Sequence, residues 1–459
     1  MGTWMKGGLA ALVVFGLCWG GAIAWWQGTG RSPSNTELAA VLLAAPLALL
    51  AALLLVRHLR KPAAPETAAA NADAAMPAPA VAGPSLALLA AALSTPHGAA
   101  AEELAKAIVD QLARSDLDPE LLDDDGYPVM SVRVEDPAGP ELREAIALWL
   151  GAQALPDPQF GDEHWRALGM VTGVAADLAH RAGAHPHALP EEIAPKSPLP
   201  TLQILLALTG AWNEAQRSAA GAWIGHVVAE SGWPASRIST SIAAQPAPGA
   251  AVSNWLIQLT AQAAGTPTLA MLLSCDSQIG EASVNALAAE GRLFGANRQQ
   301  GLIPGEGAAG LLLADATQAV LFDSEPVHLH TVAARRDDSA DVARKPDAAL
   351  LRSLGTQACT QAAVAPAKVA VLLADTGHRT SRVMELMELA NQELAQLDAG
   401  TDVLATGGAC GHAGAVPFVT ALALAHQQAL ERQAPVLCVS NEDPHYRSAV
   451  LVRPPVQPA

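Results

Sequence analysis

The sequence predicts an α/β protein with buried, largely parallel sheets, preceded by a pair of membrane-spanning helices. Short apolar runs alternate with longer amphipathic runs, most regularly from about residue 202 onward. The alternation has a similar rhythm in two stretches, roughly 127–325 and 326–455. Strands that alternate with helices are typical of parallel sheets covered on both faces. A third observation, two long apolar segments within residues 1–61, predicts the membrane hairpin.

The composition suits helices packed closely on a buried sheet. Of the 459 residues, 51% are hydrophobic but only 4% are aromatic. The formal net charge of −17 opposes binding to a phosphate backbone, so we exclude nucleic acid as a partner. Five scattered cysteines without CxxC spacing indicate neither a disulfide framework nor a zinc site and favour a reducing compartment. We expect no cofactor and no metal.

Two segments near the N-terminus are each long enough to cross a bilayer as a helix. Residues 7–26 contain no charge, and residues 37–56 contain one charge at their start. Arg57, Arg60 and Lys61 directly follow the second segment, so the positive-inside rule places the rest of the chain in the cytoplasm. The sequence therefore predicts a two-pass membrane protein whose larger part lies in the cytoplasm.

Two alternatives to this membrane hairpin stay open. Small residues at Ala22–Ala24 match a signal-peptide cleavage site, which would remove the first span and leave the second. Alternatively, both segments are buried core helices. The predicted divisions are a transmembrane hairpin (1–61), an Ala/Pro-rich linker (62–84), a mixed, helix-rich segment (85–200) and two α/β halves (201–325 and 326–459).

In the segment before residue 201 we expect three elements. Ser85–Leu117 is predicted to be helical, with an interruption at Pro96–Gly98, because Leu and Ala dominate it. Tyr127–Val134 alternates between polar and apolar residues and predicts a strand. Pro140–Leu150 predicts a helix with acidic residues near its start, where they suit the helix dipole.

Apolar runs and helical patterns then alternate through both halves. Short apolar runs predict strands, listed in order as Leu202–Gly210, Thr268–Ser277, the run after Gly310, Pro326–Ala334, Ala367–Gly377, the run from Asp402, and two runs after Gln433. Longer amphipathic runs predict helices, in order Glu214–Glu230, Ser253–Gly265, Ala282–Glu290, Asp347–Val364, Ser381–Leu397 and Ala415–Gln433. Ser253 is predicted to cap its helix and Gly265 to end it.

A glycine-rich turn between Gly301 and Gly310 precedes the apolar run Leu311–Leu313. A turn so rich in glycine indicates that the backbone passes close to another group or adopts positive φ. We expect these glycines to let the two halves pack closely, with Glu306 making buried hydrogen bonds.

Three stretches, taken in order, resemble the β-ketoacyl synthases, which are condensing enzymes with the thiolase-like fold. "LFGANRQQGLIPGEGAAGLLLAD" is similar to that family's R-P-F-D-x-x-R-D-G-x-x-x-G-E-G-A-G pattern, with matches at Phe294, Arg298, Gly301, Gly305, Glu306, Gly307 and Ala308. "ALLRSLGTQACTQAAVAPAKVAVLLADTG" resembles the helix and strand that end in N-A-H-G-T, and "GGACGHAGAVPFV" resembles the K-S-x-x-G-H-x-x-A-A-G turn. The resemblance covers about Leu202–Pro454 and implies duplicated α/β halves in five layers, α/β/α/β/α.

The resemblance implies a cysteine nucleophile at the start of a buried helix, which is the position where the helix dipole favours a thiolate. This sequence has Pro246 at that position or, with a one-residue slip, Gln245, and neither side chain can be acylated. Cys275 lies on the next strand and Cys410 in the wrong turn, so we interpret both as packing residues.

The resemblance also implies two histidines that stabilise an oxyanion. Asp375 occupies the expected place of the first histidine, and His378 follows three residues later. His412 matches the second histidine, although Gly407 replaces the lysine five residues before it, and we interpret His412 as a retained structural hydrogen-bonding residue. The glycine-rich loop near the family's C-terminus is replaced here by a stretch that includes Glu442. The vestigial catalytic candidates are His412, Gln245 and His378.

The loss of the nucleophile predicts a membrane-anchored, catalytically degenerate thiolase-like protein that acts as a cytoplasmic binding or adaptor platform. Within this class it looks like the adaptors of type VI secretion, which load lipase-type effectors, so the expected partner is a secreted effector protein. The alternative is an acyl-thioester enzyme, in which Gln245 would serve a decarboxylase, or a non-catalytic partner subunit of an active synthase. The resemblance also implies a homodimer formed through central strands.

Overall fold

The computed structural model describes residues 82–123, 126–153, 155–186, 200–209, 211–244, 248–342 and 346–455. All of them belong to one compact unit, Ala78–Ala459. The two predicted membrane segments, most of the linker, Gln245 and Pro246 lie outside the described residues. Among the helices within these ranges, none combines the length and apolar character that a membrane span requires.

Ten strands form one hydrogen-bonded sheet in the order β10-β9-β11-β12-β8-β1-β7-β6-β4-β5. Five strands come from the first part of the chain, namely β1 (Leu86–Ser94), β4 (Leu202–Leu208), β5 (Ile238–Ala244), β6 (Leu269–Ser277) and β7 (Glu306–Ala314). Five come from the second part, namely β8 (Val327–Arg335), β9 (Val371–Ala374), β10 (Val403–Ala405), β11 (Val436–Ser440) and β12 (Tyr446–Arg453). The two sets meet where Leu86–Leu88 of β1 pairs with β8.

The two sets of strands have the same internal topology. In each set the first strand runs antiparallel to the fifth, the fifth antiparallel to the fourth, and the fourth, second and third are mutually parallel. The order β1-β7-β6-β4-β5 is therefore repeated as β8-β12-β11-β9-β10 on the other side of the β1–β8 junction. This repetition confirms the predicted internal duplication.

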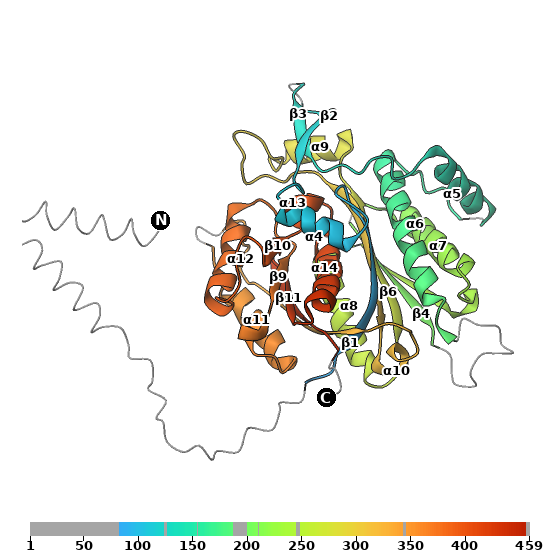
Figure 1. Ribbon diagram of the computed structural model, residues 1–459. Coiled ribbons are helices and arrows are strands. Elements are labelled where there is room, and N and C mark those ends of the chain that lie inside the picture. Colours follow the sequence, from blue (N-terminus) through green and yellow to red (C-terminus); the bar gives the residue numbers. More distant parts are fainter. Residues whose placement is uncertain are drawn as a thin grey trace, which may run out of the picture. The chain divides into compact units, whose positions relative to one another are not determined.

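Helices cover the outer face of each half and fill the space between the halves. The outer helices are α5 (Pro140–Ala152), α6 (Asp162–Ala182) and α7 (Glu214–Glu230) on the first half, and α11 (Ala349–Gln361) and α12 (Thr380–Glu393) on the second. Between the halves lie α8 (Pro248–Ala263) and α14 (Val416–Arg432), whose apolar side chains share one core with strands of both halves. Figure 1 shows this succession of helical and sheet layers.

The predicted helix over Ser85–Leu117 is wrong in its first part. Leu86–Ser94 is the central strand β1, and only α4 (Ala101–Val109) is helical. A run of leucine and alanine has helical propensity, but tertiary context outweighs that preference where a strand can pair with β7 and β8. One strand of the first half therefore comes from a part of the chain to which the sequence assigned no role.

The first half also carries an insertion that the second half lacks. Between β1 and α6 lie α4, the two-stranded sheet of β2 (Asp116–Leu122) and β3 (Pro128–Ser131), and α5. In the second half the chain passes from β8 to α11 without another helix or strand among the residues described there. Three short helices complete the fold, α9 (Glu281–Ala289), α10 (Ala316–Ala319) and α13 (Gly407–Cys410).

The predicted role of the glycine-rich turn is confirmed at Gly305. A Cβ atom on Gly305 would lie 2.0 Å from the carbonyl oxygen of Cys410 and 2.7 Å from Cα of Gly411, so only glycine allows this approach of the two halves. Gly411 has φ +63, which also favours glycine. The contact brings the turn that carries His412 against the start of β7.

Glu306 makes the buried hydrogen bonds that the sequence predicts. Its side chain is fully buried and accepts bonds from Arg166 Nε at 2.8 Å, Val134 N at 2.7 Å and Ser277 Oγ at 2.8 Å. Arg166 Nη2 adds a further contact at 2.6 Å. A buried carboxylate with this many donors holds α6, β6 and the chain after β3 around the glycine turn.

Candidate functional site

The central helices α8 and α14 both begin at a group of cavities between the halves. Three adjoining cavities, of about 190, 300 and 400 Å³, are each lined by His412, and we call them together the central cavity. The 300 Å³ part is lined by Gly249 in the first turn of α8 and by Gly414 just before α14. The structure therefore directs the N-terminal ends of both central helices to the central cavity.

His412 lies where all three parts of the central cavity meet. Its backbone N–H donates a 2.7 Å hydrogen bond to Ile303 O, which fixes the turn, while its ring has no hydrogen bond to any described residue. Burial lowers the pKa of His412 to about 4, and the carboxylate of Glu442 opposes this only in part. The imidazole is therefore neutral at pH 7, and the structural hydrogen bond of this residue comes from its backbone.

Asp375, directly after β9, fixes the loop that follows β11. Its carboxylate accepts bonds from Ser440 Oγ at 2.5 Å, Asn441 N at 2.8 Å and Glu442 N at 3.2 Å. Burial raises the pKa of Asp375 to about 6, against the lowering effect of these donors. This side chain is used to hold a loop, since three donors already engage it.

A second hydroxyl–carboxylate pair lies at the matching place in the first half. Thr209 Oγ1 donates to Asp276 Oδ1 at 3.3 Å, and Gln278 Nε2 donates to Asp276 Oδ2 at 2.8 Å. Thr209 and Asp276 follow the Ala207–Ser274 register pair by two residues, as Asp375 and Ser440 follow Ala374–Val439 by one. Burial, with a smaller contribution from the charge of Glu163, raises the pKa of Asp276 to about 7, against the lowering effect of the hydrogen bond from Gln278.

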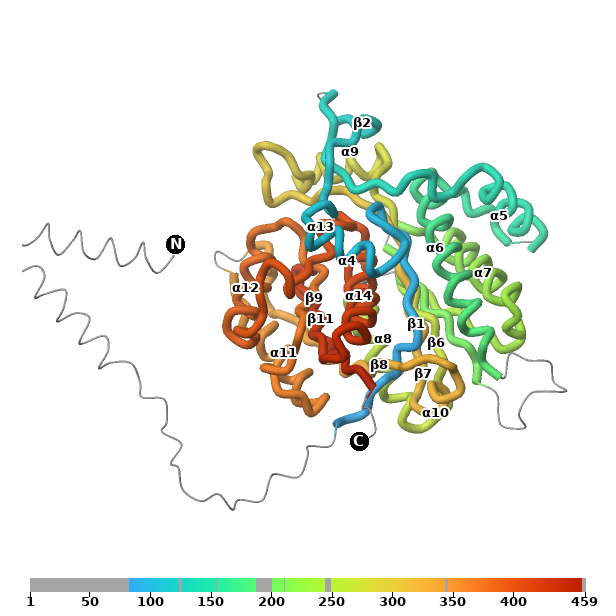
Figure 2. Tube along the Cα trace, viewed as in Figure 1, coloured from blue at the N-terminus to red at the C-terminus, as the bar shows by residue number. Residues whose placement is uncertain are grey.

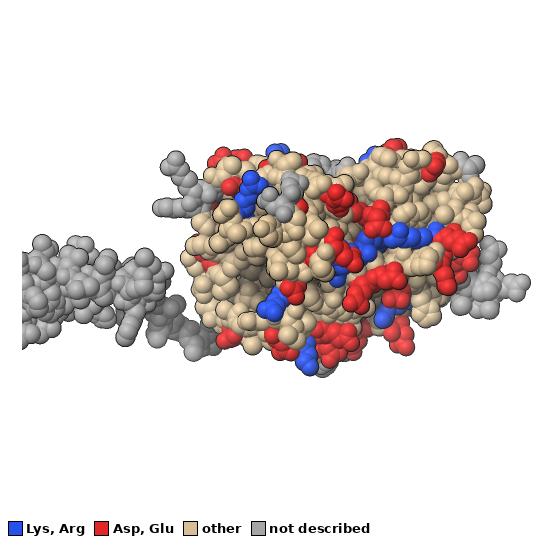
Figure 3. All heavy atoms as spheres, turned by 90° about the horizontal axis from the view of Figure 1, so that it is seen from above, with Lys and Arg blue, Asp and Glu red and all other residues tan. Residues whose placement is uncertain are grey.

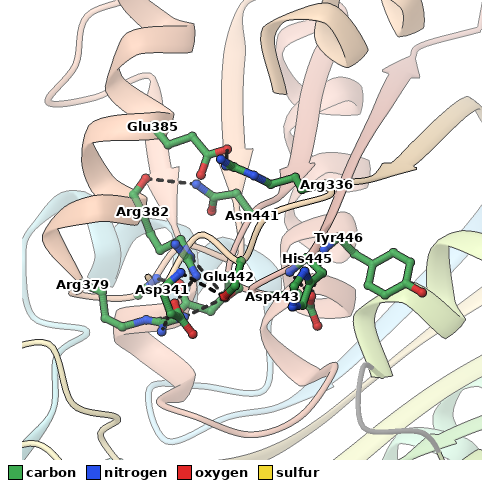
Figure 4. Close-up of polar contacts among 12 residues, drawn as sticks. Arg336, Asp341, Arg379, Arg382, Glu385, Asn441, Glu442, Asp443, His445 and Tyr446 are labelled. Carbon is green, nitrogen blue, oxygen red and sulfur yellow. Dashed lines mark hydrogen bonds and ion pairs between the residues drawn. The ribbon is translucent and has the colours of Figure 1, made fainter. Parts of the chain in front are cut away.

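The loop after β11, which includes Glu442, is held by arginines (Figure 4). Arg379 donates to Glu442 Oε1 at 2.7 Å and to Asp341 at 3.0 Å. Arg382, which is almost fully buried, contacts Asp341 as well, and its carbonyl accepts a bond from Asn441 Nδ2 at 3.0 Å. A loop fixed by so many charged contacts forms a rigid wall of the central cavity.

His378 lines the 190 Å³ part of the central cavity together with His412 and Asp375. Its ring meets the ring of Phe294 edge to face, with centroids 5.0 Å apart. Burial lowers the pKa of His378 below its usual value, while Glu442 and a backbone hydrogen bond with Gly301 oppose the shift. The structure therefore brings two of the three vestigial candidates to one cavity, and the third, Gln245, lies outside the described residues.

No thiol among the described residues opens into the central cavity. The cysteines at 275, 359, 410 and 438 are all buried and unpaired. Burial raises the pKa of Cys410 to about 12 and that of Cys359 to about 11, and it raises the pKa values of Cys275 and Cys438 as well. Because the thiolate is the nucleophilic form, these four cysteines are packing residues rather than nucleophiles.

Sequence reasoning missed Thr209 and Asp276, and also Arg166 as the partner of Glu306. Thr209 and Asp276 each stand at the end of an apolar run, which is the position where parallel strands present functional side chains. The sequence shows that both residues end apolar runs, but it does not show the strand register that places Thr209 and Asp276 side by side. Arg166 carries no local signal, since it lies in α6, distant along the chain from Glu306.

No family model matches the sequence, and no significant relative was found among curated proteins. Ketosynthases are among the solved structures that are similar to this chain. They include the ketosynthase from module 6 of the bacillaene synthase of Bacillus subtilis 168, with a TM-score of 0.58, 12% identity and coverage of 82% of this chain and 72% of that one.

Two further ketosynthases of similar fold come from two-subunit or carrier-bound assemblies. One is the ishigamide ketosynthase/chain length factor, with a TM-score of 0.51, 13% identity and coverage of 81% of this chain and 99% of that one. The other is a ketosynthase of a type II polyketide synthase in complex with its acyl-carrier protein, with a TM-score of 0.55, 13% identity and the same coverage. The described part of this chain therefore has the mixed α/β, thiolase-like fold of the ketosynthases.

Proposed function

We propose that this chain is a ketosynthase-like protein that has lost condensing chemistry and serves as a binding platform for another protein. The observation that carries the proposal is the state of the central cavity: none of the four described cysteines opens into it, and Asp375 stands where the resemblance places a histidine. Condensation needs a thiolate and two imidazoles around one thioester. With no described thiol at the cavity and Asp375 in the place of one histidine, the scaffold retains His412, the central cavity and its surface.

The loop after β11 supports this proposal. Asp375, Arg379 and Arg382 engage its backbone and side chains, so the loop forms a fixed wall instead of a flexible entrance. An enzyme that admits an acyl chain needs a passage to its nucleophile, whereas a binding platform benefits from rigid geometry.

The finer proposal is that the platform is anchored in the bacterial inner membrane and acts in the cytoplasm as an adaptor that presents a secreted effector. It rests on residues 7–26 and 37–56, on the basic residues after the second of them, and on the Ala/Pro-rich linker. A long tether lets a bound partner stay near the membrane without a fixed orientation. Loading of a type VI effector is the specific form of this proposal.

A malonyl- or acyl-carrier-protein assay tests the loss of chemistry. The full chain is incubated with malonyl-carrier protein, and carbon dioxide release and covalent acylation are followed by mass spectrometry. We expect neither. Acylation of any residue, or decarboxylation that is lost in His412→Ala, would overturn the proposal in favour of an acyl-thioester enzyme.

One observation favours that enzyme as the second candidate. The ring of His412 is neutral, lines the central cavity and has no hydrogen bond to a described residue. A neutral imidazole can donate its N–H to an enolate oxygen. In this alternative Gln245 fills the nucleophile position of a decarboxylase. A related form of it is a non-catalytic subunit paired with an active synthase.

The homodimer predicted from the resemblance remains part of the proposal. The ten-stranded sheet ends in two edge strands, β5 with seven residues and β10 with three. In place of the central strands that the resemblance implies, we propose the longer edge strand, β5, as the one from which a second copy extends the sheet. Sedimentation of the full chain in detergent, compared with a variant carrying Ser241→Pro on β5, distinguishes a dimer from a monomer.

A further inference from the structure

The β2–β3 hairpin lies apart from the duplicated sheet. It forms its own two-stranded sheet within the inserted segment of the first half, and neither set of five strands includes it. Figures 1 and 2 show the hairpin projecting from the end of the molecule next to α9. The described residues of the matching half contain no such hairpin, so it is not needed to build the duplicated core. The hairpin is therefore a candidate for a separate role.

The inner face of the hairpin is firmly anchored. Asp118 accepts bonds from Ser131 Oγ at 2.7 Å and Arg133 Nε at 2.8 Å. Burial alone would raise the pKa of Asp118, but these donors hold it below its usual value. Leu121 and Val129 pack in one apolar cluster with residues of α9 and its flanking turns, Ile279, Val284, Leu287, Leu293 and Leu302. The hairpin is therefore a built projection with a defined outer face.

That outer face is apolar and open to solvent. Leu117 is 58% exposed, Leu122 is 50% exposed and Tyr127 is 68% exposed. Met130 lies directly opposite Leu117 in the ladder and so shares its face. We call Leu117, Leu122 and Met130 the hairpin face; Tyr127 is exposed just before β3. Leucines held in solvent on an anchored two-stranded sheet are typical of a protein contact site.

The charge around the hairpin face selects its partner. Between Asp110 and Asp136 the described residues include seven acidic and two basic ones, a net charge of −5. Figure 3, which looks down on the end from which the hairpin projects, shows more Asp and Glu than Lys and Arg on that surface. An anionic lipid surface or a second acidic copy of this chain would be repelled there, whereas a basic protein surface would be attracted.

The base of the hairpin is continuous with the central cavity. Arg114, Ser115 and Val132 line its 190 Å³ part together with His412. Val132 N donates a 3.0 Å hydrogen bond to Pro304 O, which ties the end of β3 to the glycine turn. A partner bound on the hairpin face would therefore stand beside the central cavity.

We propose that the hairpin face docks a protein whose contact surface has an apolar centre and a rim of lysine and arginine. The inference rests on the proposed binding function and adds to it the surface and the chemistry of the partner. Apolar contact at Leu117 and Leu122 supplies most of the affinity, and the acidic rim supplies orientation and speed of association.

Site-specific photo-crosslinking tests the location. A photoreactive amino acid is placed at Leu117, and separately at Leu148, in the full chain within its native cell. Leu148 is a matched control, because it is a leucine of the same inserted segment with 69% exposure but lies on α5. We expect one protein to be captured from position 117 and not from position 148.

The captured protein is then purified, and its affinity for the full chain is measured. We expect Leu117→Asp to weaken binding at least about 10-fold, as for a contact-centre residue, and Leu148→Asp to leave it unchanged. Raising NaCl from about 0.05 to about 0.5 M should weaken binding to the wild type, and less so for Asp116→Lys. Circular dichroism confirms that each variant is folded, since these side chains are exposed.

The outcomes separate this inference from the proposed function. A captured protein that binds equally well to Leu117→Asp, or more tightly at high salt, would overturn the hairpin docking site and leave the binding platform intact. Carrier-protein chemistry at the central cavity would overturn the platform itself. If no protein is captured from position 117 while the chain binds a partner through another surface, the hairpin inference fails alone.

Discussion

The hydroxyl of Ser440 donates a 2.5 Å hydrogen bond to the carboxylate of Asp375 just beyond the last register pair of β9 and β11, as Thr209 donates to Asp276 just beyond that of β4 and β6. In the second half the acid follows β9 and the hydroxyl belongs to β11. In the first half the acid lies on β6, which corresponds to β11, and the hydroxyl follows β4, which corresponds to β9, so the two groups are exchanged. Two duplicated strand ends have therefore kept the same kind of contact with opposite polarity, on two sides of His412.

Replacing Asp375 tests its role as a loop anchor. Asp375→Ala removes the acceptor for Ser440 Oγ, Asn441 N and Glu442 N, and buried donors left without a partner should cost roughly 3 kcal/mol. Asp375→Asn keeps an oxygen for the two N–H groups and an amide that can donate to Ser440, so it should cost much less. Urea denaturation of the full chain measures both, and equal losses would contradict the assigned contacts.

The buried carboxyl of Asp276 gives a pH dependence of known sign. The pKa of Asp276 is about 7 in the folded state, above its value in the unfolded state, so between these two values the folded state holds a proton that the unfolded state has lost. The folded state therefore loses stability as the pH rises from about 4 to 7. Asp276→Asn removes this loss, and its stability relative to the wild type should rise by about 4 kcal/mol between pH 4 and 8.

Asp402 provides a control of opposite sign. Burial would raise the pKa of Asp402, but hydrogen bonds from Arg432 and the backbone of Asp398 lower it on balance. Its contribution to stability is present above the unfolded pKa and is lost as pH falls through the folded pKa. Asp402→Asn should therefore destabilise the chain more at neutral pH than at about pH 3. The same direction of change in both variants would refute the sign for Asp276.

The close contact at Gly305 predicts a large cost for one methyl group. In Gly305→Ala the new Cβ would lie 2.0 Å from Cys410 O, and because the obstacle is backbone, we expect a loss of about 3 kcal/mol. Gly408→Ala is the matched control, since nothing lies within 4 Å of its added Cβ. Denaturation midpoints compare the two, and similar midpoints would show that the halves do not meet at Gly305.

The buried pair of Arg166 and Glu306 should be strongly coupled. Arg166→Leu leaves a fully buried carboxylate with only neutral donors and should cost about 3–5 kcal/mol. The double variant Arg166→Leu with Glu306→Gln should lose clearly less than the sum of the single variants. A double-mutant cycle by urea denaturation measures the coupling, and additive losses would mean that the pair contributes nothing specific.

The four buried cysteines should resist alkylation in the folded chain. At a pKa of about 11 or more, as burial gives Cys359 and Cys410, the thiolate fraction at neutral pH falls at least about 100-fold below that of a free thiol. Peptide mapping after iodoacetamide treatment, native against urea-unfolded, follows each site separately. Rapid native modification at Cys410 would instead reveal a reactive thiol beside His412.

Elements with a strong local signal were predicted well from the sequence. The helix Glu214–Glu230 has the predicted bounds, because an Asn213 cap and a helical pattern define it locally. The predicted Ser253 cap is wrong: α8 starts earlier, at Pro248, and Ser253 Oγ donates within the helix to Gly249 O. Serine favours a helix start but also fits a helix interior when it bonds back to the preceding turn.

The candidate site was only partly accessible from the sequence. The resemblance located His412 and Asp375, since both follow recognisable motifs. The partners of Asp375, the pair of Thr209 and Asp276, and the arginine-held loop depend on strand register between distant segments, which no local pattern encodes. For the same reason β1 was missed, because a leucine–alanine run without period shows neither its strand nor its partners.

The position of β1 has a consequence for how the protein is made. Leu86 pairs with Leu329 and Ala87 with Ala314, so the first strand to leave the ribosome waits for partners that are translated much later. Until β7 and β8 appear, a nine-residue apolar segment remains without its ladder, and contacts so distant along the chain form slowly. Nascent chains that stall before Glu306 would expose this segment and call on chaperones, so synthesis itself should be the most vulnerable stage in the life of this protein.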